Sequence, residues 1–170
     1  SLDSFEENVR KTKEVDEVAQ QFGVDVEAEI IFVGANGNVL NDEIKSIYTN
    51  VEDAEKFVQK TNVDSLAVSI GTSHGLYKGI PKINFQRLSE LRNVLTIPLV
   101  LHGGSGSGDD NLNRCAREGI SKINIYSDFI AAGAKSVTEK SFTNYIDVLK
   151  TSREGMKTIL KHYYHVFETK

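Results

Sequence analysis

Residues 98–106, Pro98-Leu99-Val100-Leu101-His102-Gly103-Gly104-Ser105-Gly106, form an apolar run that stops at a histidine and continues into a glycine-rich turn. The continuous apolar residues predict a buried strand of a parallel sheet. The glycines let backbone N–H groups approach a ligand before the next helix begins. The stretch therefore indicates a strand, a metal-binding side chain and an anion-binding turn in immediate succession.

The same order of features occurs earlier in the chain, where the apolar run 65–70 is followed by Gly71-Thr72-Ser73-His74-Gly75. His74 and His102 each follow the carboxyl end of a predicted strand, where α/β sheets collect their ligands. Imidazole is the commonest metal ligand, so we expect the two histidines to share one metal ion. A catalytic zinc ion takes three protein ligands, and Glu29 is a candidate for the third or for a second site.

The composition is that of a soluble globular domain, with 39% hydrophobic and 26% charged residues among 170. A net charge of -4 without a long basic run gives no electrostatic basis for binding nucleic acid or an anionic membrane. The sequence shows neither a membrane-length apolar run nor a signal-peptide pattern, so we expect a cytoplasmic protein. The single Cys115, at helical spacing from Leu112 and Ala116, is predicted to be a small core residue.

Predicted helices and strands alternate along the chain. Helices are expected from Ser4 to Gly23, from Asn50, from Asn84, from Asp109 to Gly119, and over about 129–142 and 152–167; strands are expected over 24–30, 65–70, 98–101 and 122–127. Strict alternation predicts one parallel sheet with crossover helices. A closed β/α barrel needs eight strands and about 200 residues or more, so four strands fit either a small open sheet or the second half of a barrel.

The first predicted strand has one apolar and one acidic face, because Val26, Ala28 and Ile30 alternate with Glu27 and Glu29. On a half-exposed strand these acids would face water. In a barrel they would line the interior near its mouth. The loop 34–43 that follows is rich in turn residues and shows no periodicity, which is typical of a binding or gating loop.

Two turns are candidates for holding a phosphate group, namely Gly103-Gly104-Ser105 and Asn124-Ile125-Tyr126-Ser127. Barrels often bind phosphate with the loops after their last two strands, so we expect the turns to face each other across one phosphate-sized pocket. Without a phosphate they would be two glycine-rich connections. The glycine spacing fits neither a dinucleotide-binding motif, nor a P-loop, nor the nucleophile elbow of a serine hydrolase.

Five stretches, in order along the chain, resemble the class II, metal-dependent ketose-bisphosphate aldolases, which include the fructose-bisphosphate and tagatose-bisphosphate enzymes. The stretches are Phe5-Glu6-Glu7-Asn8-Val9, Val26-Glu27-Ala28-Glu29, residues 67–79, residues 99–106 and residues 119–125. The resemblance implies a zinc-dependent TIM (β/α) barrel. Residues 1–170 would form the C-terminal portion of this single domain, supplying about its last four strands.

The resemblance also implies an activity and a set of site residues. Members of this family cleave a ketose bisphosphate reversibly to dihydroxyacetone phosphate and an aldehyde, in glycolysis and related carbohydrate metabolism, and their Zn²⁺ ion polarises the ketone. His74 and His102 would bind the catalytic zinc ion, and Glu29 would belong to a second metal position. The positions implied to bind dihydroxyacetone phosphate are Gly75, Lys78, Gly103, Gly104, Ser105, Asn124, Ile125, Tyr126 and Ser127, with Lys78 close to the phosphate.

Several positions depart from the family pattern. The proton-transferring aspartate and the third zinc-binding histidine are expected upstream of Ser1, so no catalytic residue is assigned and we expect these 170 residues alone to be inactive. The loop 34–43 replaces a stretch that carries a catalytic glutamate, for which Asp42 and Glu43 are only candidates. Ile31 stands where a glycine is usual, and Tyr126 where the family often has Asp or Asn.

Two hypotheses therefore remain after the sequence analysis. The first is an aldolase of which this chain is the C-terminal part. The second is a non-catalytic, aldolase-like module that binds a sugar phosphate or a metal ion. In the first case the outermost strands of the half-barrel carry unpaired edges, so we also expect a homo-oligomer.

Overall fold

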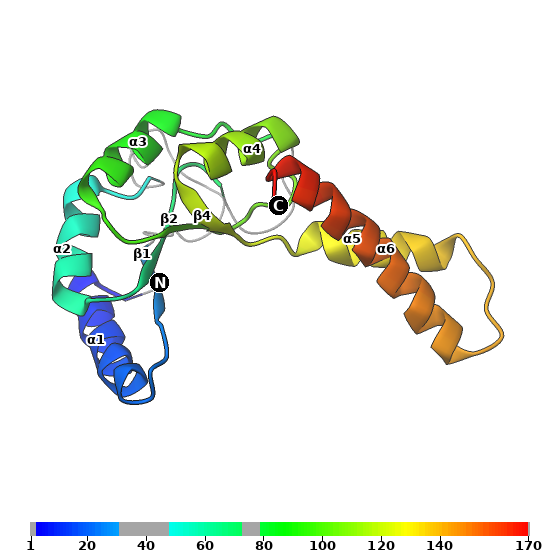
Figure 1. The fold of residues 1–170 in the computed structure, drawn as a ribbon, viewed down its shortest axis with the longest axis horizontal. Helices are drawn as coiled ribbons and strands as arrows, with labels where there is room; N and C mark the ends of the chain where they lie inside the picture. The colour runs from blue at the N-terminus through cyan, green and yellow to red at the C-terminus, as the bar shows by residue number, and fades with distance from the viewer. Residues whose placement is uncertain (1–2, 31–47, 73–78, 170) are drawn as a thin grey trace.

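A computed structural model describes residues 3–30, 48–72 and 79–169 (Figure 1). Helices and strands alternate in the predicted order: α1 (Phe5–Gln21), β1 (Glu27–Ile30), α2 (Val51–Thr61), β2 (Ser65–Val68), α3 (Phe85–Val94), β3 (Leu99–Leu101), α4 (Asp109–Glu118), β4 (Ile120–Ile123), α5 (Ser127–Thr138) and α6 (Tyr145–Val166). The alternation predicted from the sequence is therefore confirmed.

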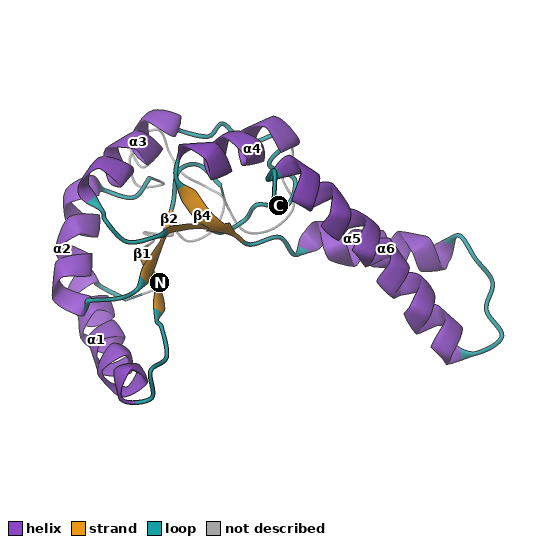
Figure 2. Ribbon diagram, viewed as in Figure 1, coloured by secondary structure: helices purple, strands orange, loops and turns teal. Residues whose placement is uncertain are grey.

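The four strands form one parallel sheet in the order β1-β2-β3-β4. Helices α1 to α4 follow one another along the outside of the sheet, as in one side of a β/α barrel (Figure 2). Each crossover helix lies between consecutive parallel strands, which is the arrangement that right-handed β-α-β units produce. The predicted fold class, an α/β chain supplying four strands of a TIM barrel, is confirmed.

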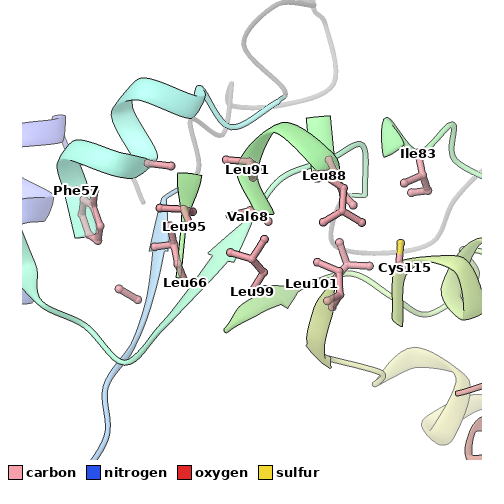
Figure 3. Packing of buried hydrophobic residues seen from close by; sticks show 14 of the residues in the cluster. Phe57, Leu66, Val68, Ile83, Leu88, Leu91, Leu95, Leu99, Leu101 and Cys115 are labelled. Carbon is pink, nitrogen blue, oxygen red and sulfur yellow. The ribbon is translucent and has the colours of Figure 1, made fainter. Parts of the chain in front are cut away.

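The hydrophobic core lies between the sheet and these helices. Leu66 and Val68 of β2 and Leu99 and Leu101 of β3 point toward α3 and α4 (Figure 3). These four side chains are at most 2% exposed, because alternate residues of a strand share one face. Cys115 of α4 is completely buried in the same core, as its helical spacing predicts.

The other face of the sheet carries the residues that alternate with the core positions. Glu29 of β1 pairs with Ala67 of β2, Ala67 pairs with Val100 of β3, and Val100 pairs with Lys122 of β4. This row gives the inner face two charged residues at its ends and two small or apolar residues between them. Of the two interpretations of the acidic strand, the interior of a barrel is the one that agrees with this arrangement.

The helix starts agree with the predicted caps. The side chains of Ser4, Asn50 and Asn84 accept hydrogen bonds from the backbone N–H groups of the third residue that follows each of them. In each case the cap satisfies an N–H group that has no partner within the helix.

The fourth strand is displaced from its predicted position. It spans Ile120–Ile123 instead of 122–127, because the strand ladder stops at Ile123 and α5 starts at Ser127. The alternating apolar residues Ile123 and Ile125 continue the strand pattern in the sequence beyond the point where the pairing ends. The prediction of a strand over 124–127 was therefore wrong, and residues 124–126 form an irregular connection to α5 instead.

Helices α5 and α6 lie side by side and extend away from the sheet (Figure 1). Gly155 permits their close approach, because it has no Cβ atom. A Cβ atom at this position would lie 2.6 Å from the carbonyl oxygen of Ala132. The two helices are displaced from the predicted 129–142 and 152–167. The sequence analysis missed the Asn144 cap, which accepts a hydrogen bond from the Asp147 amide at 3.0 Å and starts α6 seven residues earlier than the predicted 152.

Candidate active site

A cluster of charged side chains lies on the inner face of the sheet, between the start of β1 and the carboxyl end of β3. Glu27 and Glu29 belong to β1, His102 directly follows β3, and Lys122 belongs to β4. The two glutamates share a face because they are two residues apart on a strand. His102 lies on the same face as Val100 for the same reason, which brings it over the sheet toward β1.

The imidazole ring of His102 lies between the two carboxylates. Its Nδ1 atom is 2.7 Å from Oε1 of Glu29, and its Nε2 atom is 3.2 Å from Oε1 of Glu27. The side chains of His102, Glu27 and Glu29 are only 18%, 28% and 32% exposed. The Nζ atom of Lys122 donates a hydrogen bond of 2.7 Å to Oε2 of Glu27.

Two opposing influences act on the Glu27 carboxyl. Partial burial raises its pKa, but the hydrogen bonds from Lys122 and His102 and the attraction of both groups outweigh burial, so the pKa is lower than usual. Glu27 is therefore an anion at neutral pH, and it orients the His102 ring. Lys122 is a member of this cluster that the sequence analysis missed, although it lies on a predicted strand next to the candidate site.

The donor types of this cluster fit a divalent metal ion. Imidazole nitrogen and carboxylate oxygen are both zinc ligands. The Nδ1–Oε1 separation of 2.7 Å is that of a hydrogen bond, so the two groups would have to move slightly apart to share one ion. The two glutamates contact opposite nitrogens of the His102 ring. A metal ion bound to one ring nitrogen can therefore also be bound by only one of the two carboxylates. Accordingly, within residues 3–30, 48–72 and 79–169 no group of three His, Cys, Asp or Glu side chains is arranged to hold a metal ion.

The two candidate phosphate turns are in direct contact with each other. The Gly104 N–H group donates to the Asn124 carbonyl oxygen at 3.1 Å, and the Asn124 N–H group donates to Leu101. A Cβ atom on Gly104 would lie 2.7 Å from side-chain atoms of Ile123 and Ile125, so only glycine permits this approach. The amides of Gly104 and Asn124 therefore join these segments to each other.

Ser105 connects the two turns through its side chain. Its Oγ atom accepts hydrogen bonds from the N–H groups of Tyr126 at 3.0 Å and Asp128 at 3.3 Å. Ser105 itself is 8% exposed, and the neighbouring Tyr126 is 72% exposed. With its oxygen accepting two hydrogen bonds, the hydroxyl group has its own proton to donate to a ligand. Ser127 is half-buried and begins α5.

Asp128 and Tyr163 also belong to this region, and the sequence analysis identified neither. The Oδ2 atom of Asp128 accepts a hydrogen bond from the Gly106 N–H group at 3.3 Å and another from the Tyr163 hydroxyl. Asp128 follows the predicted turn by one residue, so its position was an available indication. Tyr163 lies 35 residues further along the chain, and only the packing of α6 brings it here.

Three predicted site residues, His74, Gly75 and Lys78, lie outside the described residues, as do the loop 34–43 and Ile31. Thr72 is the last described residue before His74 in the sequence. Its Oγ1 atom donates a hydrogen bond of 2.7 Å to the carbonyl oxygen of His102. The segment that leads from β2 toward His74 therefore passes beside His102.

The fold, the charged cluster of Glu27, Glu29, His102 and Lys122, and the joined turns at 103–105 and 124–127 are those of a β/α-barrel protein with polar groups gathered on one face of its sheet. Comparison with known proteins makes this assignment specific. The profile of the family described as "Fructose-bisphosphate aldolase class-II" matches residues 1–170. The chain belongs to the class II fructose-bisphosphate aldolase family, and it corresponds to the C-terminal part of the aldolase barrel.

Individual relatives agree with this assignment. The YdjI protein of Escherichia coli strain K12 is 37% identical over 154 residues, which make up 90% of this chain and 55% of YdjI. The crystal structure of the YdjI aldolase has a TM-score of 0.84 at 33% identity and covers 98% of this chain and 58% of that chain. This chain therefore spans little more than half the length of these relatives.

A more distant structure shares the fold. The fructose-bisphosphate aldolase of Campylobacter jejuni has a TM-score of 0.75 at 22% identity, with 98% of this chain and 57% of that chain covered.

Among the helices that the structure describes, none has the length and apolar character that a membrane span requires.

Proposed function

We propose that this chain is part of a class II aldolase that cleaves a ketose bisphosphate, fructose bisphosphate or tagatose bisphosphate, to dihydroxyacetone phosphate and an aldehyde. The observation that carries the proposal is the short segment 102–105, which supplies both clusters. His102 contacts Glu29, and three residues later the Ser105 hydroxyl joins the turn 124–127. A ligand carrying a ketone and a phosphate needs these two kinds of group close together.

His102 and Glu29 are the described residues that we propose as ligands of a Zn²⁺ ion, with His74 as a further ligand. Glu27 is hydrogen-bonded by Lys122, and it would then hold the His102 ring from the side opposite Glu29. A zinc ion bound there would supply Lewis-acid polarisation of the ketone oxygen. The contact between Thr72 and the His102 backbone supports a position of His74 next to this pair.

The phosphate group is proposed to bind at the joined turns, which contain Gly103, Gly104, Ser105, and Asn124 to Ser127, with Gly75 and Lys78 as further contacts. The Ser105 hydroxyl would donate its proton to a phosphate oxygen while the two backbone amides hold its oxygen in place. A hydrogen bond to a charged oxygen is stronger than one between neutral groups. The proton-transferring aspartate is proposed to lie upstream of Ser1.

The alternative is a module that binds a sugar phosphate or a metal ion without catalysis. Tyr126 favours it, because this exposed tyrosine replaces the Asp or Asn that is frequent in the family. In either case we propose one domain over residues 1–170 that completes a barrel, a homo-oligomer, and a cytoplasmic location. Neither nucleic acid nor a membrane is proposed as a partner, since the net charge of -4 offers no basis for binding either.

The test compares this chain with a version extended upstream through the expected aspartate–histidine pair. Release of dihydroxyacetone phosphate from fructose 1,6-bisphosphate and from tagatose 1,6-bisphosphate is followed with added Zn²⁺ and with a chelator. We expect chelator-sensitive cleavage by the extended version and none by residues 1–170. An extended version that binds dihydroxyacetone phosphate but cleaves neither bisphosphate would support the binding module instead.

A further inference from the structure

The last turns of α6 contact the N-terminal end of α5 beside the proposed phosphate turn. The hydroxyl group of Tyr163 donates a hydrogen bond to Oδ2 of Asp128, and the same oxygen accepts the Gly106 N–H group. The Asp128 backbone N–H group donates to Oγ of Ser105. One residue of α5 thus contacts both halves of the glycine-rich turn and is itself held from α6.

We propose that Tyr163 is a positioning residue for phosphate binding, which acts by holding the Asp128 carboxylate against the Gly106 amide. This inference rests on the proposed function, in which the turn at 103–106 binds the phosphate of the substrate. Tyr163 does not contact the ligand in this proposal. It acts through Asp128 on the shape and the charge of the turn.

Packing of the Tyr163 ring fixes the direction of its hydroxyl group. Tyr163 is 7% exposed and stacks on Phe167, with ring centroids 5.6 Å apart and an interplanar angle of 16°. Phe129, the residue after Asp128, packs on the same ring at 6.4 Å. A ring held between Phe129 of α5 and Phe167 at the C-cap of α6 has little freedom to rotate, so the hydroxyl stays directed at Asp128.

The electrostatics of the turn explain why Asp128 needs a partner. A carboxylate beside an anion site repels the ligand unless hydrogen-bond donors compensate its charge. Tyr163 and Gly106 supply two donors to one oxygen of this carboxylate. Burial and the bond to Asp128 raise the pKa of Tyr163, so the phenol keeps the proton that it donates at neutral pH.

Gly106 is the part of the turn that depends most on this support. Its φ angle of +73° is in the left-handed region, and the residue is exposed, unlike Gly104 and Ser105. Without Asp128 in place, the Gly106 amide has lost its partner and the turn gains freedom that ligand binding must then remove. Loss of the Tyr163 hydroxyl should therefore weaken phosphate binding without disrupting the fold.

The test uses the 170-residue chain and two ligands, inorganic phosphate and dihydroxyacetone phosphate, with dissociation constants measured by calorimetry. We expect Tyr163→Phe, which keeps the ring and removes only the hydroxyl, to raise both constants about tenfold. Tyr164→Phe is the matched control, because Tyr164 is 52% exposed on the same helix, and it should leave both constants unchanged. Phe167→Leu should lower the melting temperature and raise the constants by less than Tyr163→Phe does, because it loosens the ring that directs the hydroxyl but keeps the hydroxyl itself.

Each result separates the alternatives. Equal affinities of Tyr163→Phe and the unchanged chain would overturn the positioning role alone, whereas no binding by the unchanged chain would overturn the phosphate site and this role with it. A larger rise of the two constants in Phe167→Leu than in Tyr163→Phe would show that packing, and not the hydroxyl, supports the turn, and would overturn the proposal. If Tyr163→Phe does not fold, the unchanged chain is titrated with phosphate while the NMR resonance of the Gly106 amide is followed. A Gly106 resonance that does not move during the titration would overturn the proposal.

Discussion

The Nδ1 atom of His102 lies 2.7 Å from Oε1 of Glu29, although β2 lies between the strands that carry these residues. Strands β1 and β3 are second neighbours, so their backbones are about 9–10 Å apart at the usual strand spacing. Between the two strands lies Ala67 of β2, which pairs with both Glu29 and Val100 and is 1% exposed. The small methyl group of Ala67 leaves the room that this contact requires.

Enlarging Ala67 should separate the pair. In Ala67→Leu the added atoms would occupy the space below the His102 ring and the Glu29 carboxylate, and overpacking of this kind costs about 1–3 kcal/mol. We expect zinc affinity to fall at least tenfold, as measured by competition with a chelating dye. Ala28→Leu on the opposite face of β1 is the control, since it perturbs the core and should lower stability while changing zinc affinity less. Equal zinc affinities of Ala67→Leu and the unchanged chain would contradict the role assigned to Ala67.

Removing the imidazole tests the proposed metal ligand directly. We expect His102→Ala to abolish zinc binding, because the substitution removes one ligand and leaves Glu27 and Glu29 as two close carboxylates without the ring between them. Zinc content after dialysis against a zinc buffer gives the stoichiometry. An unchanged stoichiometry in His102→Ala would remove His102 from the ligand set.

A glycine outside the clusters tests the backbone that leads to them. Gly71 has a φ angle of +118°, and a Cβ atom there would lie 2.5 Å from the backbone oxygen of Lys82. We expect Gly71→Ala to lower the free energy of unfolding by about 2 kcal/mol and the melting temperature by about 4–8 °C. Gly79→Ala is the control, because nothing lies within 4 Å of the added atom. Similar melting temperatures for the two variants would contradict the tight approach at Gly71.

The sequence predicted the elements whose determinants are local or periodic. Asn50 and Asn84 cap their helices, and Leu99 to Leu101 form a buried strand, as expected from residue type and spacing. Glu29 and His102 were predicted at one end of the sheet because parallel strands end together. The structure adds their direct contact.

Other features depend on pairing that no local pattern encodes. The contact between Lys122 and Glu27 requires the register of β4, which shifts between Leu99 and Val100. The contact between Tyr163 and Asp128 requires the crossing of α5 and α6, 35 residues apart. The strand predicted over 122–127 ends at Ile123 for a related reason, because Tyr126 bonds to Ser105 instead of continuing the sheet.

The single cysteine provides a measure of the core that is independent of the site. Burial, with a smaller contribution from Glu118, raises the pKa of Cys115 to about 12. The unfolded chain loses this proton near pH 9, so between about pH 9 and 12 the folded state binds more protons and stability falls as pH rises. Relative to Cys115→Ala, the unfolding free energy of the unchanged chain should fall by up to about 1.4 kcal/mol per pH unit there. Parallel pH profiles of the two chains in urea denaturation would contradict this burial.

The final prediction separates the phosphate turns from the metal ligands. Ser105→Ala removes the oxygen that accepts the Tyr126 and Asp128 amides, so two N–H groups lose their partner and the two turns lose their side-chain link. It also removes the hydroxyl proton that we propose for the phosphate. We expect the dissociation constant of dihydroxyacetone phosphate to rise at least tenfold, while the zinc stoichiometry stays that of the unchanged chain. Ser121→Ala, at an exposed position of β4, is the matched control and should alter neither quantity. A Ser105→Ala chain that binds dihydroxyacetone phosphate normally would exclude the Ser105 hydroxyl from phosphate binding. A Ser105→Ala chain that loses zinc would show that the phosphate turns and the proposed metal ligands are not independent.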